Sequence, residues 1–72
     1  MKNFVSYYYV IKEKSTREVR KFIGDVVVDY PIKSEGDIKY TKKLIEEGVR
    51  AACGSYFEFV SASIITWRPL DE

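Results

Sequence analysis

The spacing of apolar residues changes at Ser34, and this change limits the folds that the chain can adopt. Before Ser34, aromatic and β-branched residues alternate with a period of two, which is typical of β-strands. Over residues 35–52, apolar residues recur at the i, i+3, i+4, i+7 spacing of an amphipathic helix. Gly54 is a residue type that commonly ends helices, and the period of two returns after it. The sequence therefore predicts the order strand, strand, helix, strand.

Ser34 is expected to cap the predicted helix, because a serine side chain at that position accepts a hydrogen bond from a free backbone N–H group. Glu35 and Asp37 add negative charge to the first turn, where the helix dipole favours it. The apolar side of this helix comprises Ile38, Thr41, Leu44, Ile45, Gly48, Val49 and Ala52. We expect this side to pack on the sheet.

The first predicted strand, residues 4–12, is largely apolar at both sets of alternate positions, so we place it in the middle of the sheet. The second covers residues 22–30 and ends at Pro31, because proline cannot donate to a strand ladder. The third lies within residues 57–67. The predicted fold is α+β, a three-stranded antiparallel sheet (ββαβ, order 2-1-3) with one helix packed on one face. The 72 residues are expected to form a single domain.

Residue counts exclude several classes of function. The chain has no histidine and one cysteine, Cys53, so it lacks the commonest metal-binding side chain and cannot form an internal disulfide or a CxxC site. No nucleophile–base pair is present in the pattern, and we expect neither an enzyme nor a cofactor or metal centre. The scarcity of cysteine in so small a domain indicates a reducing compartment. We expect a cytoplasmic protein without a signal peptide or membrane span, since no apolar run approaches the roughly 20 residues of a span.

One helix can cover only one face of the predicted sheet. In the second strand, Asp25 and Asp29 occupy odd positions, so the even positions are expected to face the helix. In the third strand, Val60, Ala62 and Ile64 are assigned to the helix side and the alternate positions to the open side. The candidate interaction face on the open side comprises Phe4, Tyr8, Val10, Val27, Ile65 and Trp67. An apolar patch of this kind usually marks an interaction site, and we expect it to join two copies of the chain as a homodimer.

Residues 12–21 form a charged connection between the first two predicted strands. The candidate basic residues in it are Lys12, Arg17, Arg20 and Lys21. An alternative function is therefore a small nucleic-acid-binding module that stacks bases on sheet aromatics and contacts phosphates with these cations. Twelve Lys and Arg against eleven Asp and Glu leave a net charge of only +1, and Asp25 and Asp29 lie on the same predicted face. Nucleic acid is thus the less favoured partner.

Several short motifs accompany this order of elements. They are Gly24-Asp25 in the second strand, Pro31-Ile32, Ser34 and Asp37-Ile38 around the helix start, and Ile64-Ile65-Thr66-Trp67-Arg68-Pro69-Leu70 near the end. In these motifs the chain resembles small bacteriophage and prophage accessory proteins, some of which act as anti-CRISPR or other host-takeover inhibitors. The resemblance implies a phage-derived, non-enzymatic protein-interaction module in the host cell cytosol, which self-associates or binds and inhibits a host protein. It carries over no individual functional residue.

Overall fold

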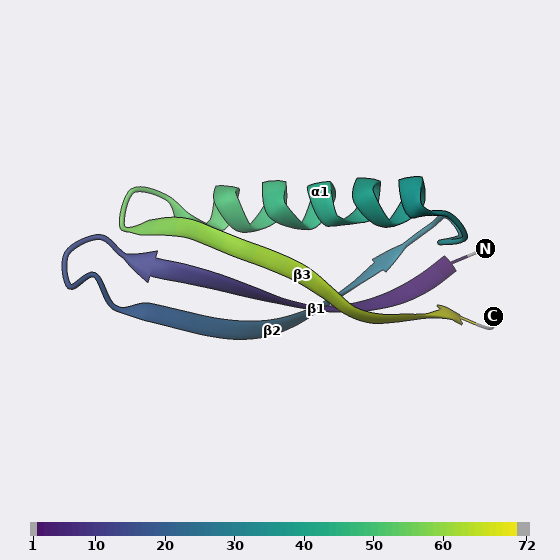
Figure 1. Cartoon of the computed structure of the whole chain (residues 1–72), viewed down its shortest axis with the longest axis horizontal. Helices are drawn as coiled ribbons and strands as arrows, with labels where there is room; N and C mark the ends of the chain where they lie inside the picture. Colours follow the sequence, from purple (N-terminus) through teal and green to yellow (C-terminus); the bar gives the residue numbers. More distant parts are fainter. Residues whose placement is uncertain (1, 71–72) are drawn as a thin grey trace.

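The computed structural model describes residues 2–70 and contains three strands and one helix in the predicted order (Figure 1). The elements are β1 (Lys2–Glu13), β2 (Val19–Val28), α1 (Glu35–Cys53) and β3 (Phe57–Leu70). The strands form one antiparallel sheet in the order β2-β1-β3. The predicted α+β fold, with the first strand in the middle and one helix on one face, is confirmed.

The helix begins at a complete capping box. The Ser34 side chain accepts a hydrogen bond from the Asp37 backbone N–H at 3.2 Å, as expected for an N-cap. In return, the backbone N–H groups of Lys33 and Ser34 donate to the Asp37 carboxylate at 3.0 and 3.1 Å, and they hold the pKa of Asp37 below its ordinary value of 3.8. The helix ends one residue past the predicted range, at Cys53, and Gly54 follows it with a φ of 60°.

The core lies between α1 and the central and third strands. Its buried apolar side chains are Val5, Ile11, Val28, Ile32, Ile45, Val49, Cys53 and Ala62. Thr41 is also fully buried, and its hydroxyl donates to the Asp37 carbonyl at 2.8 Å. The Tyr30 hydroxyl lies 2.7 Å from the same hydroxyl, so the polar atom that Thr41 brings into the core has hydrogen-bond partners.

The helix lies along β3 rather than over the middle of the sheet (Figure 1). The described residues are correspondingly elongated, with extents of 43 × 20 × 17 Å and a radius of gyration of 13.5 Å. A compact chain of this length has a radius of gyration of roughly 11 Å. The off-centre helix leaves the far strand, β2, with little cover on the face that points toward α1.

Two irregularities in β3 change which face its side chains occupy. The register against β1 shifts between Ser6 and Tyr7 and again between Val10 and Ile11, so Ile65 and Val60 are skipped in the pairing. Each skipped residue inverts the alternation of the residues beyond it. Ala62, between the two shifts, is 4% exposed and lies on the helix side, as predicted.

The predicted open-side positions of Trp67 and Phe59 are wrong for this reason. Trp67 lies opposite Val5, which is fully buried under α1, so its side chain is on the helix side of the sheet rather than on the open side. Val60, which was assigned to the helix side, lies unpaired at the second register shift and is 50% exposed. Phe59 lies opposite Ile11 on the helix side, where the Arg50 guanidinium sits 4.4 Å from its ring centroid.

Candidate interaction surface

The sheet has an outer face, which points away from α1, and an inner face, which carries α1 (Figure 1). On the outer face, two cations lie over aromatic rings of β1. The Lys21 ammonium is 4.4 Å from the Tyr8 ring centroid, and the Arg68 guanidinium is 5.2 Å from that of Phe4. These distances are within the range of cation–π attraction, so charged groups partly cover both rings.

Polar side chains fill much of the remaining outer face. Between the two rings, the Ser6 hydroxyl donates to the Asp25 carboxylate at 3.0 Å. Across from β1, the register places Ser61, Ser63 and Thr66 of β3 on the same face. The outer face is therefore mixed in character rather than apolar.

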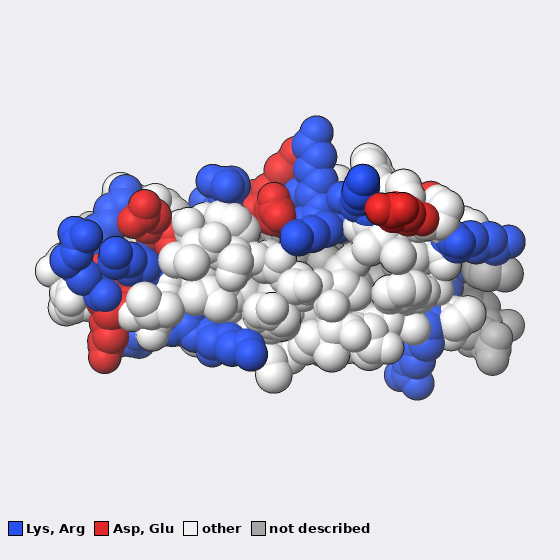
Figure 2. Space-filling view, in the orientation of Figure 1, with Lys and Arg blue, Asp and Glu red and all other residues white. Residues whose placement is uncertain are grey.

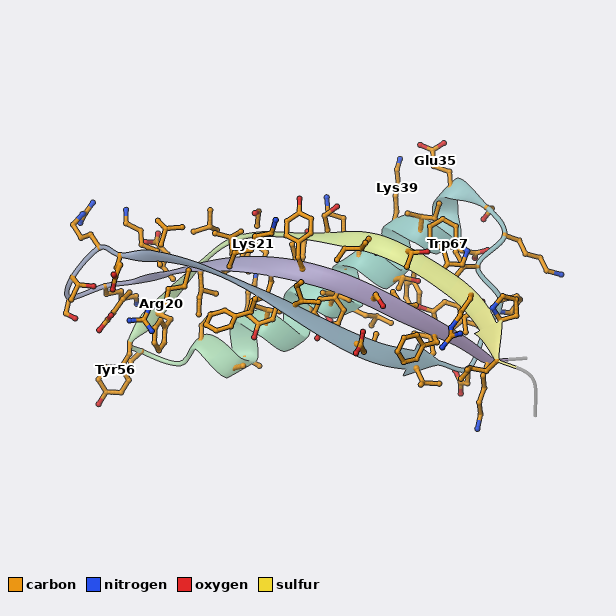
Figure 3. The ribbon with its side chains drawn as sticks, turned by 90° about the horizontal axis from the view of Figure 1, so that it is seen from below. Arg20, Lys21, Glu35, Lys39, Tyr56 and Trp67 are labelled. Atoms are coloured by element: carbon orange, nitrogen blue, oxygen red, sulfur yellow. The ribbon has the colours of Figure 1, made fainter. Side chains whose placement is uncertain are left out.

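The six residues of the candidate interaction face are not brought together. Those on the outer face are Phe4, Tyr8, Val10 and Val27. Trp67 lies on the inner face, and Ile65 sits at a register shift with 53% of its surface exposed. Figure 3, which looks at the outer face, shows Trp67 at the end of the molecule where α1 begins, near Glu35 and Lys39 in that view. The prediction of one apolar outer patch that includes Trp67 is therefore wrong, because the register shifts in β3 turn Trp67 inward.

The strand β2 is exposed on both faces. On the outer face, Ile23 is 73% and Val27 is 50% exposed. On the inner face, Phe22 is 40% and Val26 is 37% exposed, although their positions face the helix layer as predicted. Alternation along a strand predicts which face a side chain occupies, but it does not predict whether the helix reaches that part of the face.

An apolar groove of about 970 Å³ runs between α1 and β2 on the inner face. Its lining includes Tyr7, Tyr9 and Phe22 from the sheet and Leu44, Gly48 and Ala52 from α1. The helix residues belong to the side that was predicted to pack on the sheet, yet Leu44 is 39% exposed. The groove exists because α1 lies along β3 and leaves these residues facing open space above β2.

The two edges of the sheet differ in regularity. At one edge, β2 pairs with β1 over ten consecutive residues without a register shift, and its sequence contains no proline. At the other edge, β3 has two register shifts, contains Pro69 and runs beside α1. Shifts, proline and helical cover are devices that protect a sheet edge from pairing with another strand. Of these, β2 has none, so its edge presents a regular row of backbone donors and acceptors.

The charged connection between β1 and β2 is shorter than predicted. Because β1 extends to Glu13 and β2 begins at Val19, only residues 14–18 connect them. Lys12 and Lys21 thus belong to strands and lie on the outer face. Within the turn, Arg17 is exposed and adopts a φ of 62°.

The four candidate basic residues do not form one surface. Arg20 points to the opposite face of β2 from Lys21, and it forms ion pairs with Glu18 at 3.2 Å and Glu13 at 3.9 Å. Figure 2 shows charged side chains along α1 and at the hairpin end, with a broad uncharged stretch over the strands below the helix. The second predicted strand also ends early, at Val28, so Asp29 lies beyond β2.

The described residues hold little that suggests other chemistry. Within residues 2–70, no three His, Cys, Asp or Glu side chains lie close enough together to bind a metal ion. Cys53 is buried and has a free thiol. In the same part of the chain, no helix is both long enough and apolar enough to span a bilayer.

Comparison with known proteins finds no relative of this chain. No protein-family model, no curated protein and no solved structure matches it.

Proposed function

We propose that this protein is a small non-enzymatic protein-interaction module, and that β2 is the element through which it binds another protein chain. The observation that carries the proposal is the exposure of β2 on both faces and along its edge. Its exposed apolar residues are Val19, Phe22, Ile23, Val26 and Val27. Single exposed apolar residues are common on protein surfaces, but one ten-residue strand here carries three on its outer face and two on its inner face.

Strand addition is the binding mode that suits this arrangement. An incoming strand would hydrogen-bond to the free edge of β2, and its side chains would cover those of β2 on both faces. On the inner face, the partner's side chains would enter the groove beside α1. Strand addition would therefore cover the exposed residues on both faces of β2, whereas binding to one face would leave the other face in water.

The origin of the protein belongs to the same proposal. The resemblance to phage accessory proteins supports a phage-derived module that acts in the cytosol, either by self-association or by binding and inhibiting a host protein. The exposed β2 is compatible with either partner, because a strand edge pairs through backbone groups that every chain has.

A second function has one observation in its favour. Tyr8 and Phe4 lie on the central strand, each with a cation over its ring, and sheet aromatics with neighbouring cations are typical of single-stranded nucleic-acid surfaces. Two observations count against nucleic-acid binding: Arg20 is engaged in ion pairs, and the carboxylate of Asp25 lies on the same face as the two rings. Binding of single-stranded RNA that weakens steeply with salt would favour this second function.

The test is co-purification of a partner with the wild-type chain, with a variant changed on β2 and with a control variant changed on β3. A tagged wild-type chain is expected to retain a second protein after nuclease treatment, whether an untagged copy of itself or a cytosolic protein. The double variant Ile23→Lys/Val27→Lys should lose that protein, whereas Val60→Lys, on β3 at a residue with the same 50% exposure as Val27, should keep it. Circular dichroism of each variant is the control for folding. Retention of nothing by the wild type, or equal retention by the double variant, would overturn the proposal.

A further inference from the structure

Two opposite charges on the outer face of β2 have no ionic partner within the described chain. Lys21 and Asp25 both point outward, and neither forms an ion pair among residues 2–70. They are four residues apart on one strand, a separation of about 13 Å, so they cannot reach each other. Lys21 instead lies over the Tyr8 ring, and Asp25 accepts a hydrogen bond from Ser6.

We propose that the partner of β2 is β2 of a second copy of this chain, paired edge to edge and antiparallel about a two-fold axis at Ile23. This inference rests on the proposed function and names its partner. In that register Ile23 lies opposite Ile23 of the second copy. Lys21 then lies opposite Asp25 of the second copy, and the same pair recurs on the other side of the axis. Opposite charges directly across an antiparallel pair stabilise it.

Neighbouring registers lack this complementarity. With both helices on one side of the sheet, the register can shift only in steps that keep opposite residues on the same face. Moving the axis to Phe22 places Lys21 opposite Ile23 and Val19 opposite Asp25. Moving it to Gly24 places Lys21 opposite Val27. Only the axis at Ile23 pairs both charges.

The inner face fits the same register. Phe22 would lie opposite Gly24 of the second copy, where that copy's own Tyr7 ring covers the glycine, so the Phe22 ring would pack beside the Tyr7 ring of the second copy. Within the chain, Gly24 is already covered from above, because a Cβ there would be 2.8 Å from the Tyr7 ring. Phe22 stacks on Tyr9 with ring centroids 5.4 Å apart. Pairing would therefore extend this row of rings across the two-fold axis.

The assembled sheet would have six strands with both α1 helices on one side. The two α1–β2 grooves would adjoin across the axis, since opposite residues of paired strands point to the same face. The free edges that remain would be the two β3 strands, which already carry the shifts, the proline and the helix. Assembly would thus stop at two copies.

A charge exchange tests the register. Light scattering after size exclusion, at tens of micromolar, is expected to give twice the chain mass of 8.4 kDa. Lys21→Asp should raise the dissociation constant of the dimer roughly tenfold, because it places two like charges opposite each other at both sites. The double variant Lys21→Asp/Asp25→Lys should restore it to near the wild-type value. Lys43→Asp, the same charge change on exposed α1, should leave it unchanged.

Disulfide trapping supplies an independent readout. In a Cys53→Ala background, which removes the one native thiol, Ile23→Cys should cross-link two copies on mild oxidation. Directly opposite Cα atoms lie about 4.5–5.5 Å apart, within the range that a disulfide spans. Val27→Cys, also on the outer face, should not cross-link alone but should do so when mixed with Val19→Cys.

A mass of 8.4 kDa, or a larger mass with no Ile23→Cys cross-link and no rescue by the charge exchange, would overturn this inference. A monomer that still retains a foreign protein through β2 would overturn the inference and leave the proposed function standing. A monomer that retains no protein would overturn both.

Discussion

Gly24 and Gly48 occupy opposite surroundings, although both face the helix–sheet layer. A Cβ at Gly24 would lie 2.8 Å from the Tyr7 ring, closer than such atoms approach, whereas among the described residues a Cβ at Gly48 would meet nothing within 4 Å. Gly24→Ala should therefore lower the free energy of unfolding by about 1–2 kcal/mol through overpacking. Gly48→Ala should raise it by about 0.5–1 kcal/mol, because glycine is a poor residue for a helix interior. Urea denaturation measures the free energy of unfolding of both variants, and equal changes in the two would contradict this account.

Asp37 links the helix cap to acid stability. Its folded-state pKa is lowered by the backbone donors of Lys33 and Ser34, so its stabilising effect is present above the ordinary value of 3.8 and is lost as the pH falls through the lowered value. Asp37→Asn should reduce the free energy of unfolding at pH 7 and make stability less dependent on pH between about 5 and 2. Glu35→Gln is the matched control, since Glu35 makes an exposed ion pair with Lys39 at 3.7 Å and should change stability little. A parallel acid dependence of Asp37→Asn and wild type would contradict the assignment.

Local residue signals were sufficient for the cap but not for contacts between distant residues. Ser34 and Asp37 are three positions apart, and their roles follow from helix geometry alone. The Tyr30 hydroxyl bonds to Thr41, and the Tyr30 carbonyl accepts from the Asn3 side chain, 27 positions earlier. These bonds depend on how β1, α1 and the turn after β2 come together, which no pattern along the chain specifies.

At the scale of the elements, their order and the bounds of the helix were predictable, but the bounds of β2 and the irregularities of β3 were not. Its inner-face side chains fall at Phe57, Phe59, Ala62, Ile64 and Trp67, with spacings that alternate between two and three. The residues at the shifts are themselves apolar and β-branched, so a regular alternation fits the sequence equally well. Without a glycine or a polar residue to mark a bulge, the face of Trp67 could not be derived.

The shifts in β3 predict an order of mutational effects. Phe59 lies half-buried on the inner face beside Arg50, and Val60 is 50% exposed. Phe59→Ala should lower the free energy of unfolding by about 2 kcal/mol, less than the loss at a fully buried phenylalanine. Val60→Ala should stay within about 0.5 kcal/mol of wild type, as surface substitutions usually do. A larger loss of unfolding free energy for Val60→Ala than for Phe59→Ala, measured by denaturant unfolding, would indicate a regular alternation along β3 and contradict the register shifts.

At the scale of the whole molecule, a small core makes stability sensitive to association. One helix lies over part of a three-stranded sheet, and much of the apolar surface of β2 stays in water. A copy that binds only the folded chain stabilises it by mass action. The melting temperature should therefore rise by a few degrees with a tenfold increase in protein concentration, as followed by circular dichroism. The Lys21→Asp variant should show a smaller rise, and a wild-type melting temperature independent of concentration would contradict self-association.

The position of α1 along β3 also bears on how the fold opens. The helix and β3 cover the core together, whereas β2 contacts it mainly through Val28, so β2 can detach without exposing most of the buried residues. In a single chain, the amide hydrogens of β2 should exchange with solvent through local opening, sooner than those of β1. In the paired form, the same amides would lie in the middle of a six-stranded sheet and become the slowest to exchange. The strand that opens first in the isolated chain would then be the last to open in the assembly.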